Sequence, residues 1–214
     1  MNRHEVLIPV GKVSLPGTAT IPEGAAGIVA FAHGSGSSRH SPRNRYVAEV
    51  LHAHGIATLL FDLLTPQEDR AYETRFDIDL LTERLLAALA WLEASAETKN
   101  LKIGCFGAST GAAAALRAAA QHASVAAVVS RGGRPDLAGA PALAAVRAPT
   151  LLIVGGRDEG VIELNQQACA LLQCEKKLEI VPGATHLFEE PGALERAAAH
   201  AAAWFARHLD NARA

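Results

Sequence analysis

The chain has 214 residues, of which 50% are hydrophobic and 20% are charged, and its formal net charge at pH 7 is −2. A chain of this length can bury a core that needs neither disulfides nor a structural metal. The near-neutral charge argues against a nucleic-acid partner, which would appear as a strong basic excess. We therefore expect one globular domain over residues 1–214.

The N-terminal segment lacks the charged start, apolar run and cleavage site of a signal peptide, and no apolar run reaches the ~20 residues of a membrane span. Three cysteines, Cys105, Cys169 and Cys174, have no His or Cys partners at metal spacing. These features predict packing thiols, a cytoplasmic location, no membrane span and no metal or organic cofactor. The sequence carries no signal for an oligomeric state.

Strand and helix signals then alternate along the chain. Residues 6–10 and 13–20 flank a Gly-Lys turn and predict an antiparallel hairpin. Short apolar runs downstream predict parallel strands buried on both faces, at residues 28–32, 56–60, 101–106, 125–129, 150–154 and 178–181. Amphipathic stretches between them predict helices over residues 79–92, 112–120, 161–172 and 193–209. The pattern favours an α/β fold, with a mostly parallel sheet, an N-terminal antiparallel hairpin and helices on both faces.

The strand at 101–106 runs directly into Gly-Ala-Ser-Thr-Gly at residues 107–111, and a helix follows. This is G-x-S-x-G in the strand–turn–helix context of a nucleophile elbow, with Ser109 as the candidate nucleophile. The glycines allow the sharp turn because neighbouring Cβ atoms would collide with the strand and helix. A helix N-cap is the structural alternative for Ser109.

An elbow serine needs an acid and then a histidine further along the chain. Asp158 follows the strand at 150–154, and His186 follows the next strand. Both loops lie at the carboxyl edge of the predicted sheet, where sites are built. We predict that His186 takes the proton of Ser109 and that Asp158 orients the imidazole. Asp136, in the loop after residues 125–129, is the alternative acid.

These segments carry a family resemblance over essentially the whole chain. Residues 31–36, 107–111, 155–158 and 183–186 resemble the α/β-hydrolase superfamily and, within it, small dienelactone-hydrolase-like proteins. Dienelactone hydrolases proper use a cysteine nucleophile in the elbow, where this chain has Ser109. The resemblance therefore implies general ester chemistry rather than the specific lactone activity.

The oxyanion hole of such enzymes uses the backbone N–H of the residue after the nucleophile, here Thr110. Resemblance to the family's His-Gly-x loops assigns the second donor to Ser35, with Gly36 as an alternative. His33, which begins this loop, is expected to brace it through hydrogen bonds.

The substrate pocket is predicted from loops at the strand ends, with Gly36, Arg39, Tyr72, Leu187 and Phe188 as its candidate residues. Arg39, Arg43 and Arg131 could recognise an acidic substrate group, although bracing of the loops is the simpler interpretation for each. Asp62 resembles a structural carboxylate that binds nearby backbone or an arginine. Only residues 130–149 separate two neighbouring strands where larger hydrolases insert a cap, so no large cap domain fits.

The leading hypothesis is a serine hydrolase that cleaves carboxylic esters of small or extended substrates through an acyl-enzyme. A thioesterase, lactonase or acyltransferase would use the same triad and tetrahedral intermediate. A haloalkane dehalogenase is disfavoured, because its elbow carries Asp where this chain has Ser109. The alternative from another class is a catalytically silent binding module with the hydrolase fold.

Overall fold

An eight-stranded sheet forms the centre of the molecule, in the order β1-β2-β4-β3-β5-β6-β7-β8. The computed structural model describes residues 1–210. The strands are β1 (Asn2–Val10), β2 (Val13–Ile21), β3 (Gly27–Ala32), β4 (Ala57–Phe61), β5 (Lys102–Ala108), β6 (Val125–Arg131), β7 (Thr150–Gly155) and β8 (Lys176–Val181). The hairpin β1–β2 and the pair β2–β4 are antiparallel, and every later pair is parallel, as the sequence predicts.

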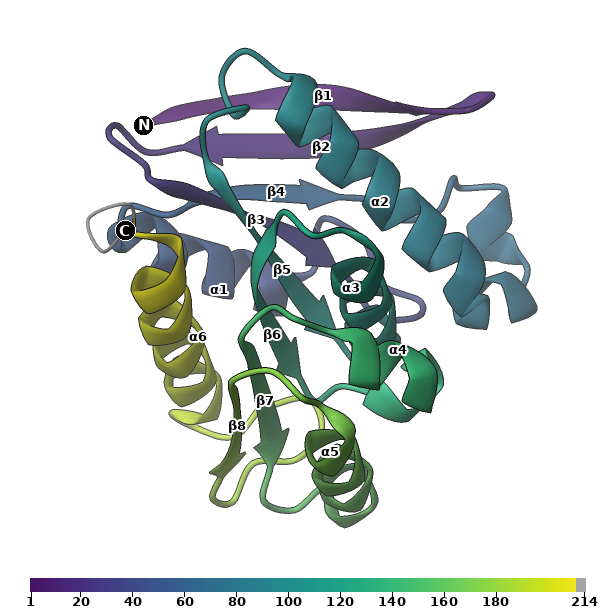
Figure 1. Cartoon of the computed structure of the whole chain (residues 1–214), viewed down its shortest axis with the longest axis vertical. Coiled ribbons are helices and arrows are strands. Elements are labelled where there is room, and N and C mark those ends of the chain that lie inside the picture. The colour runs from purple at the N-terminus through teal and green to yellow at the C-terminus, as the bar shows by residue number, and fades with distance from the viewer. Residues whose placement is uncertain (211–214) are drawn as a thin grey trace.

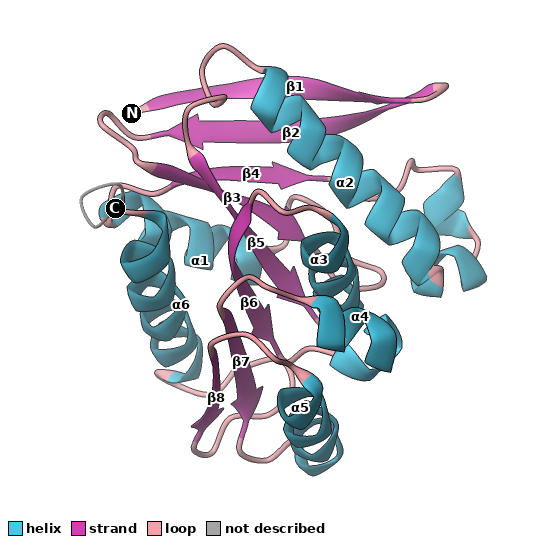
Figure 2. Cartoon of the chain, in the orientation of Figure 1, coloured by secondary structure: helices cyan, strands magenta, loops and turns pink. Residues whose placement is uncertain are grey.

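Helices cover both faces of this sheet (Figure 1). They are α1 (Pro42–Ala53), α2 (Ile78–Ala94), α3 (Thr110–Gln121), α4 (Ala140–Ala145), α5 (Glu159–Leu171) and α6 (Ala193–Leu209). Three short 3₁₀ turns, η1 (Glu68–Arg70), η2 (Glu73–Phe76) and η3 (Pro135–Ala138), lie in the loops. Figure 2 shows α1 and α6 on one side of the strands and α2, α3, α4 and α5 on the other.

The alternation of side chains along each parallel strand divides the hydrophobic core in two. In β3, Ile28 and Ala30 point into the core beneath α2 and α3, whereas Val29 and Phe31 point into the core beneath α1 and α6. Residues of one parity face one side of a strand and residues of the other parity face the opposite side. Strands with apolar residues at both parities are therefore buried on both faces.

The edge strand β8 and the helix α1 differ from the sequence-based expectations. The strand β8 is the outer edge of the sheet, and most of its residues are exposed or half-buried rather than buried on both faces. The helix α1 was not predicted, because its stretch is polar, although Ser41 caps it by accepting a hydrogen bond from Asn44 N–H at 3.3 Å. Within residues 1–210, the region between β6 and β7 holds only η3 and the short helix α4, which the sequence pattern also does not predict, and no large cap domain is inserted there.

Candidate active site

The turn between β5 and α3 holds Ser109 in an unusual backbone conformation, with φ 51° and ψ −122°. The residues two positions before and two positions after it are glycines for steric reasons. A Cβ on Gly107 would lie 2.4 Å from Ala112 Cα, and a Cβ on Gly111 would lie 2.2 Å from the Ala32 carbonyl oxygen. The Ser109 side chain makes no capping hydrogen bond to α3, so its hydroxyl is not used as an N-cap.

The acid and the histidine meet across two neighbouring loops. Because β7 pairs with β8, the loops that carry Asp158 and His186 lie side by side. The His186 Nδ1 atom is 2.7 Å from Asp158 Oδ2. A carboxylate only accepts hydrogen bonds, so Nδ1 donates and Nε2 is left as the basic nitrogen. His186 and Ser109 line the same cleft, which has a volume of about 250 Å³.

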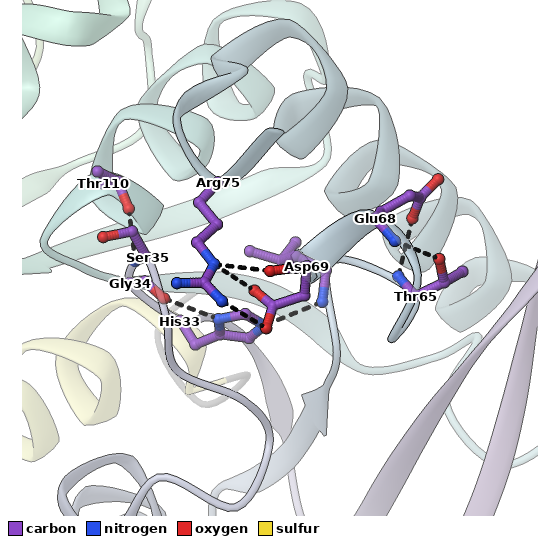
Figure 3. A network of polar contacts seen from close by, with 9 residues as sticks. His33, Gly34, Ser35, Thr65, Glu68, Asp69, Arg75 and Thr110 are labelled. Atoms are coloured by element: carbon purple, nitrogen blue, oxygen red, sulfur yellow. Dashed lines mark hydrogen bonds and ion pairs between the residues drawn. The ribbon is translucent and has the colours of Figure 1, made fainter. Parts of the chain in front are cut away.

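The loop after β3 contacts the elbow directly. Ser35 N–H donates to the Thr110 hydroxyl oxygen at 2.9 Å, and Thr110 is buried (Figure 3). A Cβ on Gly34 would lie 3.1 Å from Ser109 Cβ, so this loop passes close to the nucleophile. The two predicted oxyanion donors, Ser35 and Thr110, are therefore adjacent, and one of them is bonded to the side chain of the other.

His33 braces this loop, as its sequence position suggested. The buried imidazole accepts a hydrogen bond from Leu63 N–H at Nε2, 3.0 Å away, so Nδ1 must be the donor to the Gly34 carbonyl oxygen, also at 3.0 Å. Burial lowers the pKa of His33 below its usual value, more than the Gly34 hydrogen bond and the nearby Asp62 and Asp69 raise it. The neutral ring thus links the loop after β3 to the loop after β4.

A second brace comes from the loop between β4 and α2. Arg75 donates to Asp69 through Nε at 3.0 Å and Nη2 at 3.2 Å (Figure 3). A Cβ built on Gly36 would lie 3.6 Å from Arg75 Nη1, so the guanidinium packs against the turn after Ser35. This loop supports the segment after β3 that carries Ser35, and none of its residues lines the cleft with Ser109.

Several predicted pocket residues lie elsewhere. Arg39 binds Asp62 instead of facing the cleft: the Asp62 carboxylate accepts hydrogen bonds from Arg39 N–H at 2.7 Å and from the Arg39 guanidinium at 2.6 Å. Arg39 lines a separate cavity near β1 and β2. Gly36 borders a small hollow beside Asp69, and Tyr72 is exposed and stacks on Phe76. Of the five candidates, only Leu187 lines the cleft with Ser109. Phe188 is buried in the core beneath α1 and α6.

The cleft also contains residues that the sequence reasoning did not single out. Ser37, Ser41 and Asn44 line it together with Arg43 and Arg131. The available signal was Ser41-Pro42, a capping serine followed by proline, which is typical of a helix start. Recognising α1 would have placed Asn44 in its first turn, next to the predicted site.

Asp136, the alternative acid, has a different partner. Arg134 binds it through two hydrogen bonds of 2.9 and 2.7 Å, and this pairing raises the pKa of Arg134.

The cysteines at 105, 169 and 174 are free thiols. Burial raises the pKa of Cys105 to about 12. Across residues 1–210, no cluster of three or more His, Cys, Asp or Glu side chains is suited to hold a metal ion, and no helix is long and apolar enough to cross a membrane.

A mostly parallel sheet with a strained serine at a strand–helix turn is the architecture of the α/β-hydrolases. The model of the dienelactone hydrolase family matches residues 26–209, and the chain belongs to that family. The crystal structure of a dienelactone hydrolase from Anabaena variabilis is 57% identical, with a TM-score of 0.95 over 98% of this chain and 99% of that one. An esterase domain from Rhodothermus marinus shares the fold at 20% identity, with a TM-score of 0.79 over 98% of this chain and all of the other.

Curated relatives from two Mycobacterium tuberculosis strains are 60% identical over 207 residues, or 96% of this chain. Both carry the provisional name phosphoribosyl transferase. The chain spans about half the length of these relatives, 46% of each.

Proposed function

We propose that this chain is a serine hydrolase that cleaves carboxylic esters through an acyl-enzyme on Ser109. The observation that carries the proposal is the 2.7 Å contact between His186 and Asp158, at a cleft that Ser109 shares with His186. The strained backbone of Ser109 supports it, because such strain is typical of nucleophile elbows. The transferase name of the longer relatives belongs to whole proteins of which this chain matches one portion, whereas this chain itself matches the dienelactone hydrolase family over residues 26–209.

In the proposed mechanism, His186 Nε2 removes the proton of the Ser109 hydroxyl as its oxygen attacks the ester carbonyl carbon. Asp158 stabilises the imidazolium that forms. The tetrahedral intermediate then collapses, and the alkoxide leaves with the proton that His186 returns. Water, activated by the same imidazole, releases the acid and restores Ser109.

The oxyanion of the tetrahedral intermediate needs backbone donors. Thr110 N–H, at the first turn of α3, is one proposed donor. Ser35 N–H is the second, and it must exchange its present bond to the Thr110 hydroxyl for a bond to the oxyanion. A hydrogen bond to an anion is about twice as strong as one between neutral groups, so this exchange is favourable.

A fluorophosphonate probe tests the nucleophile. We expect one adduct on the wild-type protein, located at Ser109, and none on Ser109→Ala. The fold should survive this change because the Ser109 side chain makes no capping bond, so we expect a loss of stability of about 1 kcal/mol or less. Ser124→Ala, which removes an exposed hydroxyl bonded to Glu93, is the matched control and should label normally.

Hydrolysis of nitrophenyl esters of increasing acyl length, and of the matching thioesters and lactones, then defines the reaction. An unlabelled, folded wild-type protein without hydrolysis of any of these would contradict the proposal and favour a silent binding module. Faster turnover of thioesters or lactones would instead assign the same triad to those substrates.

A further inference from the structure

Arg131 is the last residue of β6 and is only 7% exposed. Its guanidinium lies 5.9 Å from the centre of the Phe106 ring and 5.7 Å from the centre of the Phe188 ring. Ala108 pairs with Arg131 across the sheet, and Ser109 N–H contacts the Arg131 carbonyl oxygen at 3.3 Å. The strand β6, which carries Arg131, thus lies beside β5, which leads to Ser109.

Within the part of the chain that the structure describes, this cation has no anionic partner. Its Nη2 donates to the neutral Asn44 Oδ1 at 3.3 Å, and its Nη1 is buried without a hydrogen-bond partner. Within residues 1–210, no carboxylate forms an ion pair with Arg131, whereas Arg39, Arg84, Arg117 and Arg134 all have one. Burial, with Arg43 nearby, lowers the pKa of Arg131 to about 10, so the group remains charged at neutral pH.

An unpaired buried charge is strongly destabilising unless something compensates for it. Arg131 lines the cleft that contains Ser109 and His186, and so does Arg43. Arg43 is half-buried, and its own partner, Glu189, is exposed and 3.5 Å away. The remaining lining residues include four serines, Gly34 and Asn44, and no Asp or Glu is among them. The cleft therefore has two cations and no anion.

We propose that Arg131 and Arg43 bind an anionic oxygen group of the substrate, a carboxylate or a phosphate, beside the ester that Ser109 attacks. The inference rests on the proposed function and narrows its substrate class to acidic esters. Both anions match the donors present, because a guanidinium offers paired N–H groups to two oxygens. The serine hydroxyls of the cleft can donate to the remaining oxygens of such a group.

Three nitrophenyl esters with the same three-methylene acyl chain test the proposal. Their acyl groups end in a methyl (pentanoate), a carboxylate (glutarate monoester) or a phosphonate (4-phosphonobutanoate). We expect kcat/KM, corrected for the uncatalysed rate, to favour one or both anionic esters over pentanoate by about tenfold or more. Comparison of the two anionic esters shows whether the site is built for a carboxylate or a phosphate.

Substitutions at the two arginines test which side chains cause the preference for anionic esters. Arg131→Met keeps an unbranched apolar side chain next to the two aromatic rings and removes the charge, and it should abolish the preference for the anionic ester. Arg43→Gln should reduce the preference about tenfold without altering the core. Arg45→Gln is the matched control, since Arg45 lies on the same helix, is exposed and lines a different cavity. It should retain the wild-type preference.

A wild-type enzyme that prefers pentanoate, or an Arg43→Gln enzyme with an unchanged preference, would overturn the proposal. Binding to Ser109→Ala separates this outcome from failure of the hydrolase mechanism. Millimolar glutarate or propylphosphonate should raise the melting temperature of Ser109→Ala but not that of Ser109→Ala/Arg43→Gln. A higher melting temperature of Ser109→Ala, combined with no esterase activity in the wild type, would support the anion site and refute the proposed ester hydrolysis. An unchanged melting temperature of Ser109→Ala would refute the anion site.

Discussion

Ser109 can adopt its backbone conformation because Gly107 and Gly111, two residues away on either side, have no side chains. A positive φ at a serine costs about 1–3 kcal/mol and persists only where the surroundings enforce it. Here the absence of side chains at Gly107 and Gly111 lets α3 approach both β5 and the end of β3. The hydroxyl is thereby presented at the end of the strand rather than turned back toward the helix N-terminus.

The two candidate acids, Asp158 and Asp136, bind different side chains. Because Asp158 accepts from His186 Nδ1, Asp158→Asn should invert the imidazole tautomer and lower kcat by up to ~10⁴-fold. Asp136→Asn should change kcat by less than about tenfold, since Asp136 is bonded to Arg134. Steady-state kinetics on a nitrophenyl ester, with circular dichroism as a check on folding, make the comparison. A larger loss in the Asp136 variant would refute the proposed triad.

Among the elements, α6 packs closely on the sheet at two glycines. A Cβ on Gly104 of β5 would lie 2.7 Å from Phe205 Cε1, and a Cβ on Gly27 of β3 would lie 2.6 Å from Leu209 Cβ. Glycine on two adjacent strands, together with the small alanines along α6, allows this contact. The helix therefore packs directly on the backbone of the strand that leads to the nucleophile.

Gly104→Ala should consequently destabilise the protein by about 1–3 kcal/mol, because the new methyl group overlaps the Phe205 ring. Urea unfolding measures the change. Gly160→Ala is the control: it lies in α5, where an added Cβ meets nothing within 4 Å, and alanine favours helices. We expect that variant to be equally or more stable, and equal losses in both would show that packing against α6 is not the cause.

The parts of the fold that the sequence predicts are the strands and helices whose own residues carry a periodic pattern of apolar side chains. The hairpin and the parallel strands have signals within their own residues, and the observed α6 has the predicted bounds of residues 193–209. The exposure of β8 depends on its being last in the sheet order, and the pairing of Arg39 with Asp62 depends on β3 lying beside β4. Both are set by tertiary contacts, which the spacing of residues within one segment does not encode.

In the whole molecule, the site lies at the carboxyl edge, where loops from both sides of the sheet meet. One core is formed beneath α2 and α3, and the other beneath α1 and α6. His33 is buried at this edge and joins the loops after β3 and β4. Its protonation state therefore affects the stability of the domain as well as the geometry of the site.

Stability should fall on acidification through His33. Its folded pKa is lowered from the ordinary value of 6.5, so below that pH the unfolded chain binds a proton that the folded chain excludes. The free energy of unfolding should decrease from about pH 6.5 downward and level off below the folded pKa. Burial lowers the pKa values of His52 and His208 as well, and they add losses of the same sign.

Urea unfolding at a series of pH values tests the contribution of His33. His33→Gln should have a shallower acid dependence than the wild type, whatever its stability at neutral pH. His40→Gln, which replaces an exposed histidine, is the control and should retain the wild-type slope. Identical slopes in all three proteins would show that His33 titrates normally in the folded state.

The order of the elements along the chain also has a consequence during synthesis. A ribosome makes the proposed nucleophile before Asp158 and His186, which follow β7 and β8, and before α6. Domains fold as units and N-terminal segments emerge first. A nascent chain therefore exposes Ser109 without a base to activate it, and β5 without the helix that packs on it. On the proposed mechanism, hydrolytic activity begins only when β8 and α6 have left the ribosome.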